Sequence, residues 1–298
     1  MSNQLKNHIL TDIGGTYVRF ARDIEGEPQN IQKYAAADFQ GLSEALSRYC
    51  NEQGIEPCGE LSIAGAGAPD NENASLWRIT NNKAFDIDLS QLKEQGWNIV
   101  QTLNDFEAAT YALPILSNDD LKTLHQGRSN NRDLCLLGPG TGLGLGYLRN
   151  RKYVQKTHGG HMPIASLNDE HGKIIKELRE NHNRALVFED IVSGPGLQNL
   201  RTKYDEEKAL RLFHEFLGIF AANAVITGNS YGGIYLTGGV IASLYEKGRF
   251  NFETFRNALC FDAVPCVKED IENTSIHIVT DPYPAFKGLI HAKSLPDN

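Results

Sequence analysis

Two glycine-rich segments that each carry a threonine could hold the phosphates of a nucleotide. They read Asp12-Ile13-Gly14-Gly15-Thr16 and Gly138-Pro139-Gly140-Thr141-Gly142, and each follows an apolar run short enough to be a strand. Glycine permits positive φ and lets backbone N–H groups approach an anion closely, while the threonine hydroxyl adds a further donor. Asp12 repels phosphate, but it can hold the water shell of a phosphate-bound Mg²⁺. The pair of segments therefore suggests phosphoryl transfer, with one nucleotide held between two lobes.

Neither segment matches a common nucleotide-binding motif. No Gly-Lys-Ser or Gly-Lys-Thr follows the glycines, as a P-loop requires, and neither segment has the spaced Gly-x-Gly-x-x-Gly of a dinucleotide-binding fold. Glycine turns after strands also occur in hairpins that bind no ligand. The prediction of a phosphate site therefore depends on the two segments together and on an acidic residue that lies between them in the sequence.

That acidic residue is Asp105, which lies where an apolar strand gives way to a helix. Residues 98–103 predict a strand, and Phe106 through Leu113 predicts a helix that stops at Pro114. Side chains at such strand ends project into the crevice where α/β sheets bind ligands, and a carboxylate there could accept the proton of a sugar hydroxyl. Asp is also a common helix N-cap, so the position alone fits either role.

The segment His158-Gly159-Gly160-His161 and the residue Glu189 each allow two interpretations. Two histidines three apart without a third ligand nearby make a poor zinc site, and the alternative is a glycine-supported turn that presents an imidazole to sugar hydroxyls. Glu189 could accept hydrogen bonds from a polyol, or it could be a solvated helix residue ahead of a serine cap. Both are therefore candidate sugar ligands.

The expected elements form two mixed α/β lobes that repeat one plan. In the first half, strands are expected at residues 8–11, 17–21, 31–34, 60–64 and 98–103, with helices at 40–52 and 89–95 and a loop at 65–69. In the second half, strands are expected at 133–137, 144–148, 234–240 and 276–279, with helices at about 169–181, 205–227 and 285–293. The apolar stripe of residues 205–227 predicts a core helix. Because no flexible linker is evident, the lobes are placed at 1–106 and 107–284.

Composition and charge limit the classes of protein that this chain can represent. The 298 residues, 41% of them hydrophobic, suffice for two lobes with a core each. A net charge of -8 and a pI near 5.6 argue against a nucleic-acid partner. Five scattered cysteines favour idle thiols in a reducing compartment over a zinc site or disulfides. No basic leader or run of eighteen apolar residues is evident, so we expect a soluble cytoplasmic protein without a membrane partner.

Six motifs, taken together and in order, resemble those of the bacterial glucokinase family. They are Asp12-Ile13-Gly14-Gly15-Thr16, Leu103-Asn104-Asp105-Phe106, Gly138-Pro139-Gly140-Thr141-Gly142-Leu143-Gly144, Gly159-Gly160-His161, Ser193-Gly194-Pro195-Gly196-Leu197 and Thr237-Gly238-Gly239-Val240-Ile241. The resemblance implies the actin-like ATPase fold, a duplicated, ribonuclease H-like α/β fold whose two lobes close over sugar and ATP. It also implies Mg²⁺ as cofactor and the C6 hydroxyl of a hexose, expected to be glucose, as the acceptor.

Carried over by position, the resemblance gives a role to each matching residue. It implies that Asp105 is the general base and that Asp105, Asn81, Asn104, His158, His161 and Glu189 line the sugar site. The nucleotide would be held by Thr11, Asp12, Ile13, Gly14, Gly15, Thr16, Gly140, Thr141, Gly142, Gly238 and Gly239, with Asp12 near Mg²⁺. The helix at about 285–298 resembles the family's return of the chain to the first lobe. A homodimer is a further expectation from the family.

Two positions depart from the family pattern. The family usually has Glu-Gly-Gly-His where this chain has His158-Gly159-Gly160-His161, and a neutral imidazole accepts one hydrogen bond where a carboxylate accepts several. Tyr17 follows Thr16 where the family commonly has Asn. These departures keep two alternatives open beside an ATP-dependent glucokinase: a kinase for another hexose, such as mannose or an amino sugar, and a catalytically weak sugar sensor.

Overall fold

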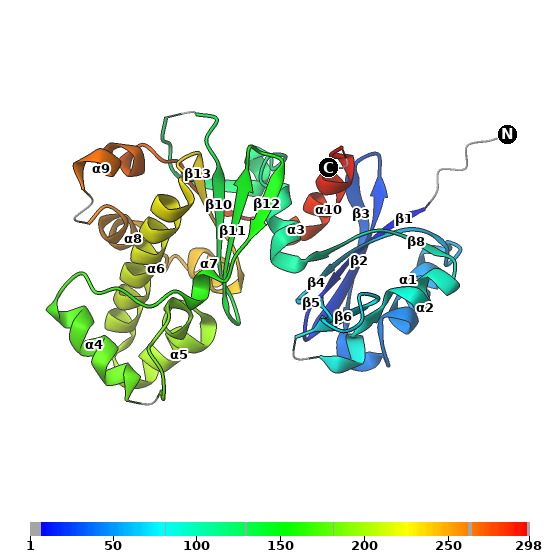
Figure 1. The fold of residues 1–298 in the computed structure, drawn as a ribbon, viewed down its shortest axis with the longest axis horizontal. Helices are drawn as coiled ribbons and strands as arrows, with labels where there is room; N and C mark the ends of the chain where they lie inside the picture. Colours follow the sequence, from blue (N-terminus) through cyan, green and yellow to red (C-terminus); the bar gives the residue numbers. More distant parts are fainter. Residues whose placement is uncertain (1–6, 81, 129, 181, 262–263, 297–298) are drawn as a thin grey trace. The chain divides into compact units, whose positions relative to one another are not determined.

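The chain folds into two compact units, which a computed structural model describes for residues 7–80, 82–128, 130–180, 182–261 and 264–296 (Figure 1). Unit 1 comprises Met1–Leu116 and Pro282–Asn298, and unit 2 comprises Ser117–Asp281. A boundary after residue 106, as expected from the sequence, would cut helix α3 (Asp105–Ala112). The chain instead leaves unit 1 after Leu116, beyond the end of that helix.

Unit 1 is built on a five-stranded mixed sheet in the order β3-β2-β1-β4-β8. The strands are β1 (His8–Ile13), β2 (Tyr17–Ile24), β3 (Glu27–Ala35), β4 (Gly59–Gly65) and β8 (Trp97–Asn104). The β1 strand is antiparallel to β2 and parallel to β4, which is parallel to β8. Parallel strands end at the same edge of a sheet, so β1, β4 and β8 bring their carboxyl ends together. The five strands expected in this half are confirmed.

Helices cover both faces of the unit 1 sheet. Helix α1 (Leu42–Gln53) packs Leu46 and Tyr49 into the core on one face. Helices α3 and α10 (Pro284–Ser294) lie side by side on the other face (Figure 1). They approach so closely that a Cβ on Gly288 would lie 1.7 Å from the carbonyl oxygen of Ala108. The C-terminal helix is thus packed directly against the helix that carries Asp105.

A small second sheet in unit 1 corrects one sequence-based expectation. Residues 65–69 were expected to form a loop, but β5 (Gly67–Pro69) pairs with β6 (Leu76–Ile79), which pairs with β7 (Ile87–Asp88) ahead of helix α2 (Leu89–Glu94). This strand was not expected because it contains glycine and proline, which are both uncommon in β-strands. At Gly67 the glycine is required, since a Cβ would lie 1.8 Å from the carbonyl oxygen of Arg78.

Unit 2 repeats the topology in a six-stranded sheet in the order β12-β11-β10-β13-β14-β9. The strands are β9 (Leu121–His125), β10 (Leu134–Pro139), β11 (Leu143–Arg149), β12 (Tyr153–Lys156), β13 (Gly233–Leu236) and β14 (Ile276–Val279). As in unit 1, three antiparallel strands are followed by two that run parallel to the first. The duplicated plan expected from the sequence is therefore confirmed. The sequence did not predict β9 and β12, which are short, polar edge strands.

Unit 2 contains one long core helix, α6 (Glu206–Gly228), and several shorter helices. The shorter helices are α4 (Asp169–Arg179), α5 (Gly194–Lys203), α7 (Gly239–Glu246), α8 (Phe252–Leu259) and α9 (Pro265–Glu272). The expected core helix is α6, whose Phe213, Phe216 and Phe220 are fully buried. Within the described residues α6 alone is long and apolar enough to cross a membrane, and 72% of its apolar window is buried inside the protein, as a core helix requires. The strand expected to reach Val240 ends at Leu236, and α7 begins at Gly239.

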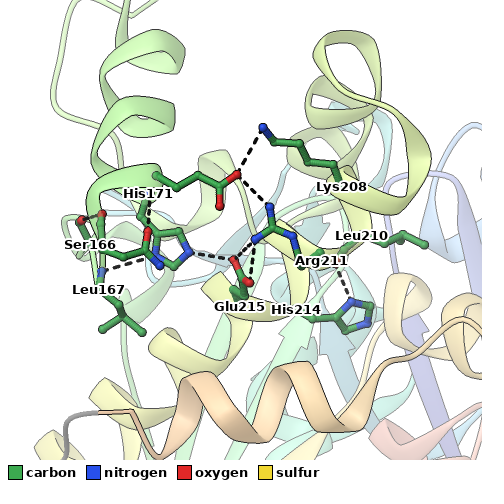
Figure 2. Close-up of polar contacts among 10 residues, drawn as sticks. Ser166, Leu167, His171, Lys208, Leu210, Arg211, His214 and Glu215 are labelled. Atoms are coloured by element: carbon green, nitrogen blue, oxygen red, sulfur yellow. Dashed lines mark hydrogen bonds and ion pairs between the residues drawn. The ribbon is translucent and has the colours of Figure 1, made fainter.

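A chain of polar contacts fastens α4 to α6 (Figure 2). His171 on α4 is 1% exposed, and its Nε2 lies 2.8 Å from a carboxylate oxygen of Glu215 on α6 while its Nδ1 accepts a hydrogen bond from the N–H of Leu167. Arg211 bonds to both Glu215 and Glu170 at 2.9 Å. Burial opposes ionisation of Glu215, but the bonds from His171 and Arg211 hold its pKa below the ordinary value. The network therefore needs an ionised Glu215.

Candidate active site

Asp105 lies at the edge of unit 1 where the parallel strands β1, β4 and β8 end. It is the first residue of α3, directly after β8, and Asp12 is the penultimate residue of β1. Burial and the negative charge of Asp12 raise the pKa of Asp105 to about 6, while an N–H donated by Phe106 at 2.8 Å acts in the opposite direction. A carboxylate of this kind is ionised at neutral pH and is a better proton acceptor than an ordinary aspartate.

The N-cap of α3 is Asn104, which settles one question that the sequence left open. The Oδ1 atom of Asn104 accepts the N–H of Phe106 at 3.0 Å, and the Glu107 carboxylate accepts the N–H of Asn104 at 3.2 Å in a capping box. The Nδ2 of Asn104 donates to the carbonyl oxygen of Gly67 at 3.1 Å. The capping role expected as an alternative for Asp105 thus belongs to its neighbour, and the Asn104 amide anchors β8 to the small sheet.

Asp12 is paired with an arginine on the neighbouring strand. The register of the β1–β2 hairpin sets Arg19 opposite Asp12, and Nη1 of Arg19 donates to Oδ2 of Asp12 at 2.8 Å. Both side chains are partly buried, with 24% and 16% of their surfaces exposed. Burial raises the pKa of Asp12, and the guanidinium of Arg19 opposes that rise. Two carboxyl groups and one guanidinium therefore share this edge of the sheet.

The first glycine turn joins β1 to β2 beside these charges. The N–H of Gly14 bonds to the carbonyl oxygen of Tyr17 at 2.9 Å, and Gly15 and Thr16 are exposed at the tip. Thr11 and Ile13 were expected among the nucleotide ligands, but their side chains are fully buried, and the Thr11 hydroxyl faces the carbonyl oxygen of Ser62 at 3.4 Å. Only backbone groups of Thr11 and Ile13 are therefore available to a ligand.

Asn82, which follows β6, lies near the same turn. Nδ2 of Asn82 donates to the carbonyl oxygen of Gly15 at 3.2 Å, so Asn82 is tied to the first glycine turn. Asn81, which the family resemblance assigns to the sugar, lies outside the described residues. Its proposed contact stays a prediction.

In unit 2, three glycine turns converge at the end of β10. The N–H of Gly140 bonds to the carbonyl oxygen of Gly142, and the carbonyl oxygen of Gly140 accepts the N–H of Gly194 at 2.7 Å. Gly238 has a φ of +95°, and a Cβ there would lie 2.5 Å from the carbonyl oxygen of Pro139. Helices α5 and α7 both begin at these turns, and helix N-termini favour anions. The arrangement suits a phosphate ligand near Gly140, Thr141, Gly142, Gly238 and Gly239.

The Gly-Gly-His segment packs tightly on the same hairpin. A Cβ at Gly159 would lie 2.3 Å from Leu145, and one at Gly160 would lie 2.3 Å from the carbonyl oxygen of Leu143. The rings of His158 and His161 lie nearly parallel, with centroids 6.1 Å apart and 5° between their planes. Both side chains are exposed, so they are accessible to a ligand.

Glu189 connects this segment to the second glycine turn. One carboxylate oxygen accepts the N–H of Leu143 at 2.7 Å, and the other lies 3.5 Å from Nε2 of His161. A Cβ at Gly142 would come within 2.6 Å of the Glu189 carboxylate, so a larger residue there would displace that side chain. Glu189 is therefore a half-buried residue of the turn cluster, and it lies in the short 3₁₀ helix Phe188–Asp190 ahead of the Ser193 cap of α5. Unit 2 thus brings together Gly142, His158, His161 and Glu189.

Sequence reasoning missed Arg19 as a member of this site. Its signal was available, because a hairpin closed by residues 14–16 pairs Asp12 with the residue seven positions later. The contact of Glu189 with Leu143 could not be read from the sequence, since the two residues are brought together only by the tertiary fold.

Comparisons with known proteins show to which family the chain belongs. The family model described as glucokinase matches residues 9–207 and 200–295. A bifunctional protein glk from Paraburkholderia xenovorans is 29% identical over 94% of this chain and 48% of its own length, so the chain spans about half of that relative. A glucokinase from Marinobacter nauticus is also 29% identical, over 95% of this chain and 96% of its own length.

Solved structures show the same fold. A glucokinase from an Antarctic psychrotroph superposes with a TM-score of 0.78 at 24% identity, covering 97% of this chain and 98% of the other. The glucokinase of Balamuthia mandrillaris in complex with glucose gives a TM-score of 0.73 at 22% identity, with 97% and 93% covered. The duplicated α/β architecture is thus the actin-like fold expected from the sequence. Because the family model matches nearly the whole length, the chain belongs to the glucokinase family.

Proposed function

We propose that this protein is an ATP-dependent glucokinase that phosphorylates the C6 hydroxyl of glucose. The observation that carries the proposal is the position of Asp105, a carboxyl group with a raised pKa at the strand edge that also holds the first glycine turn. The family membership and the similarity to a glucokinase of nearly equal length support glucose and ATP as the substrates.

In this proposal Asp105 is the general base. Its carboxylate accepts the proton of the C6 hydroxyl as the oxygen attacks the γ-phosphorus of ATP, and ADP leaves with the bond electrons. A pKa of about 6 leaves Asp105 largely ionised at pH 7 while making it a stronger base than an exposed aspartate. The bond from the N–H of Phe106 orients the carboxylate and leaves its second oxygen for the hydroxyl.

The glycine turns hold the phosphates in this proposal. The exposed backbone of Gly15 and Thr16 in unit 1 and the turns at Gly140 and Gly238 in unit 2 supply N–H groups for anionic oxygens. Such groups neutralise the charge that spreads over the phosphoryl oxygens during transfer.

Mg²⁺ fits the residues at the unit 1 edge. The described part of the chain contains no group of three His, Cys, Asp or Glu residues able to hold a metal. Mg²⁺ on a nucleotide does not need one, because phosphates and water fill most of its coordination sphere and one or two carboxylates suffice. Asp12, fixed by Arg19, would hold the ion through its water shell. When bound, the ion withdraws charge from the phosphates.

Sugar ligands are proposed in each of the two units. Asn81, Asn104 and Asp105 are proposed from unit 1, and His158, His161 and Glu189 from unit 2. Glu189 and the two imidazoles form one polar cluster that can accept and donate hydrogen bonds to hydroxyl groups. A cytoplasmic location stays a prediction from the sequence, and a homodimer stays a prediction of the family resemblance.

The test is a phosphoryl-transfer assay with MgATP and a panel of hexoses, in which the product is identified as glucose 6-phosphate. Asp105→Asn keeps the acceptor for the Phe106 N–H but removes the base, so kcat should fall about 10²- to 10⁴-fold. Asp169→Asn is the matched control, because Asp169 also follows an Asn cap at a helix start but is exposed in unit 2. An inactive unsubstituted protein, or full activity of Asp105→Asn, would contradict the proposal.

A further inference from the structure

We propose that Asn82 is a positioning residue of the first glycine turn, which it holds so that the backbone N–H of Thr16 points outward to an anionic oxygen of the nucleotide. The inference rests on the proposed function and extends it to a residue that the family resemblance leaves without a role. In this role Asn82 acts through the peptide group that joins Gly15 to Thr16, and not by touching the nucleotide itself.

The group that Asn82 holds is the carbonyl oxygen of Gly15. Nδ2 of Asn82 donates to this oxygen at 3.2 Å, across 67 positions of the chain. The peptide group between Gly15 and Thr16 is trans, and a planar trans peptide sets its C=O and its N–H in opposite directions. The bond therefore turns the N–H of Thr16 away from Asn82. Because Gly15 and Thr16 are both exposed, a ligand can reach this N–H.

Backbone bonds fix the two ends of the turn but leave its tip to Asn82. The N–H of Gly14 donates to the carbonyl oxygen of Tyr17 at 2.9 Å, and the carbonyl oxygen of Thr16 accepts the N–H of Ala36 at 2.9 Å. Between these bonds lies the peptide group that follows Gly15, and glycine gives that group the widest choice of φ and ψ. The bond from Asn82 removes this freedom before a ligand binds, so binding does not have to order the tip.

The backbone of Asn82 is itself anchored in the core of unit 1. Its N–H bonds to the carbonyl oxygen of Ile79 at 3.4 Å, and its carbonyl oxygen accepts the N–H of Phe85 at 3.1 Å. The side chains of Ile79 and Phe85 are both buried. The N–H of Thr80 bonds to the carbonyl oxygen of Ala66 at 2.8 Å, which joins the end of β6 to the residue after β4. The Asn82 amide therefore donates from a fixed backbone.

The small sheet that precedes Asn82 also contacts the helix cap next to the proposed base. Gly67 on β5 accepts the Nδ2 of Asn104 at 3.1 Å, and Asp105 follows Asn104 directly. One small sheet is thus linked both to the phosphate turn, through Asn82 and Gly15, and to the N-cap of α3. These two amide bonds fix the turn and the base against the same structural element.

The decisive experiment measures KM for MgATP and KM for glucose in Asn82→Leu and Asn82→Gln. Leucine is similar in size but has no donor, so KM for MgATP should rise about fivefold, the effect of one hydrogen bond. KM for glucose and kcat should hold, because an interaction made equally in the ground state and the transition state changes only the KM of its own substrate. Asn82→Gln keeps a donor on a longer arm and should restore KM for MgATP to within about twofold of wild type.

Three outcomes would overturn the inference. The first is an unchanged KM for MgATP in Asn82→Leu, and the second is an equal rise in Asn82→Gln. The third is a rise in KM for glucose alone, which would show that Asn82 serves the sugar and not the phosphate turn.

Asn130→Leu is the matched structural control. Nδ2 of Asn130 likewise donates to a distant backbone carbonyl oxygen, that of Tyr231 at 3.0 Å. This contact lies ahead of β10 and β13, whose amino ends pair through Leu134 and Gly233, whereas the glycine turns follow the carboxyl ends of these strands. We expect this variant to keep both wild-type KM values. A rise in KM for MgATP as large as that of Asn82→Leu would show a general effect of a lost amide contact and would refute the specific role.

Isothermal titration calorimetry gives a readout that does not depend on catalysis. The ligand is a non-hydrolysable ATP analogue with Mg²⁺ and without sugar, and its Kd should rise about fivefold in Asn82→Leu and stay near the wild-type value in Asn82→Gln. If the unsubstituted protein binds the analogue but phosphorylates no hexose, the proposed function fails, and the role of Asn82 is then decided by this comparison alone. Equal Kd values in wild type and Asn82→Leu, or no binding of the analogue to the unsubstituted protein, would refute that role.

Discussion

Replacing the proposed base should make the protein more stable at neutral pH. Asp105 has a pKa of about 6 in the folded chain against 3.8 for an ordinary aspartate, chiefly because of burial and then because of Asp12. The folded state therefore binds more protons than the unfolded state between these values, and stability falls as the pH rises through that window. Asp105→Asn removes this cost and keeps the bond with Phe106. The environment that makes Asp105 a stronger base therefore destabilises the folded chain when Asp105 is ionised.

The magnitude follows from the pKa difference. A difference of roughly two units corresponds to about 3 kcal/mol above pH 6, because each unit is worth about 1.4 kcal/mol. Loss of a negative charge at the first turn of α3 takes back up to about 1 kcal/mol. The expected gain is therefore about 2 kcal/mol at pH 7.5, and it should vanish near pH 4. For a domain of this size the gain raises the unfolding temperature by about 4 to 8 °C.

Differential scanning calorimetry at pH 7.5 and pH 4.5 measures this difference for the transition in which unit 1 unfolds. The control is again Asp169→Asn, which removes a negative charge at an exposed helix start and should lose a few tenths of a kcal/mol. If Asp105→Asn is no more stable than wild type at pH 7.5, the charged form of Asp105 carries no cost and the reasoning is wrong. The same holds if the control gains as much.

Three further changes test other parts of the structure. His158→Glu supplies a carboxylate that accepts more hydrogen bonds than an imidazole, so KM for glucose should fall about tenfold, and steady-state kinetics across hexose epimers would measure it. Gly160→Ala forces a Cβ against the carbonyl oxygen of Leu143, and we expect a loss of about 1 to 3 kcal/mol in thermal unfolding together with a raised KM. His171→Leu leaves Glu215 without one of its donors, and calorimetry of unit 2 should show a loss of about 1 to 3 kcal/mol with kcat unchanged.

Much of the fold could be predicted because apolar runs and glycine turns are local signals. The strands of the unit 1 sheet, the long helix α6 and the repeated hairpins all follow from patterns within a few residues. What failed depends on distant parts of the chain. The strand at Gly67 exists because β6 pairs with it, and Glu189 meets the second turn only after the chain between them has folded.

The sequence indicated which residues form the candidate site, but it indicated only some of the contacts between them. Asp105 follows a strand, and that alone placed it at a sheet edge, but its pKa depends on burial in the folded chain and then on the charges of Asp12 and Arg19. The cap could not be assigned because Asn104 and Asp105 are both good N-caps, and the choice depends on which one keeps an extended backbone. Thr11 looked like part of the glycine turn, yet β1 is central in the sheet, so its side chain is buried.

Comparison of the two hairpins explains why the chemistry is assigned to unit 1. In both units the first two strands end in a glycine turn, with Ile13 facing Val18 in one and Pro139 facing Leu143 in the other. One position earlier, unit 1 has the Asp12–Arg19 ion pair, whereas unit 2 has Gly138 facing Gly144. The second turn therefore offers backbone groups where the first offers charges. In the proposed function phosphate is held at both turns, so a metal-holding carboxylate and its counter-charge are needed at one turn only, and that turn lies at the same sheet edge as Asp105.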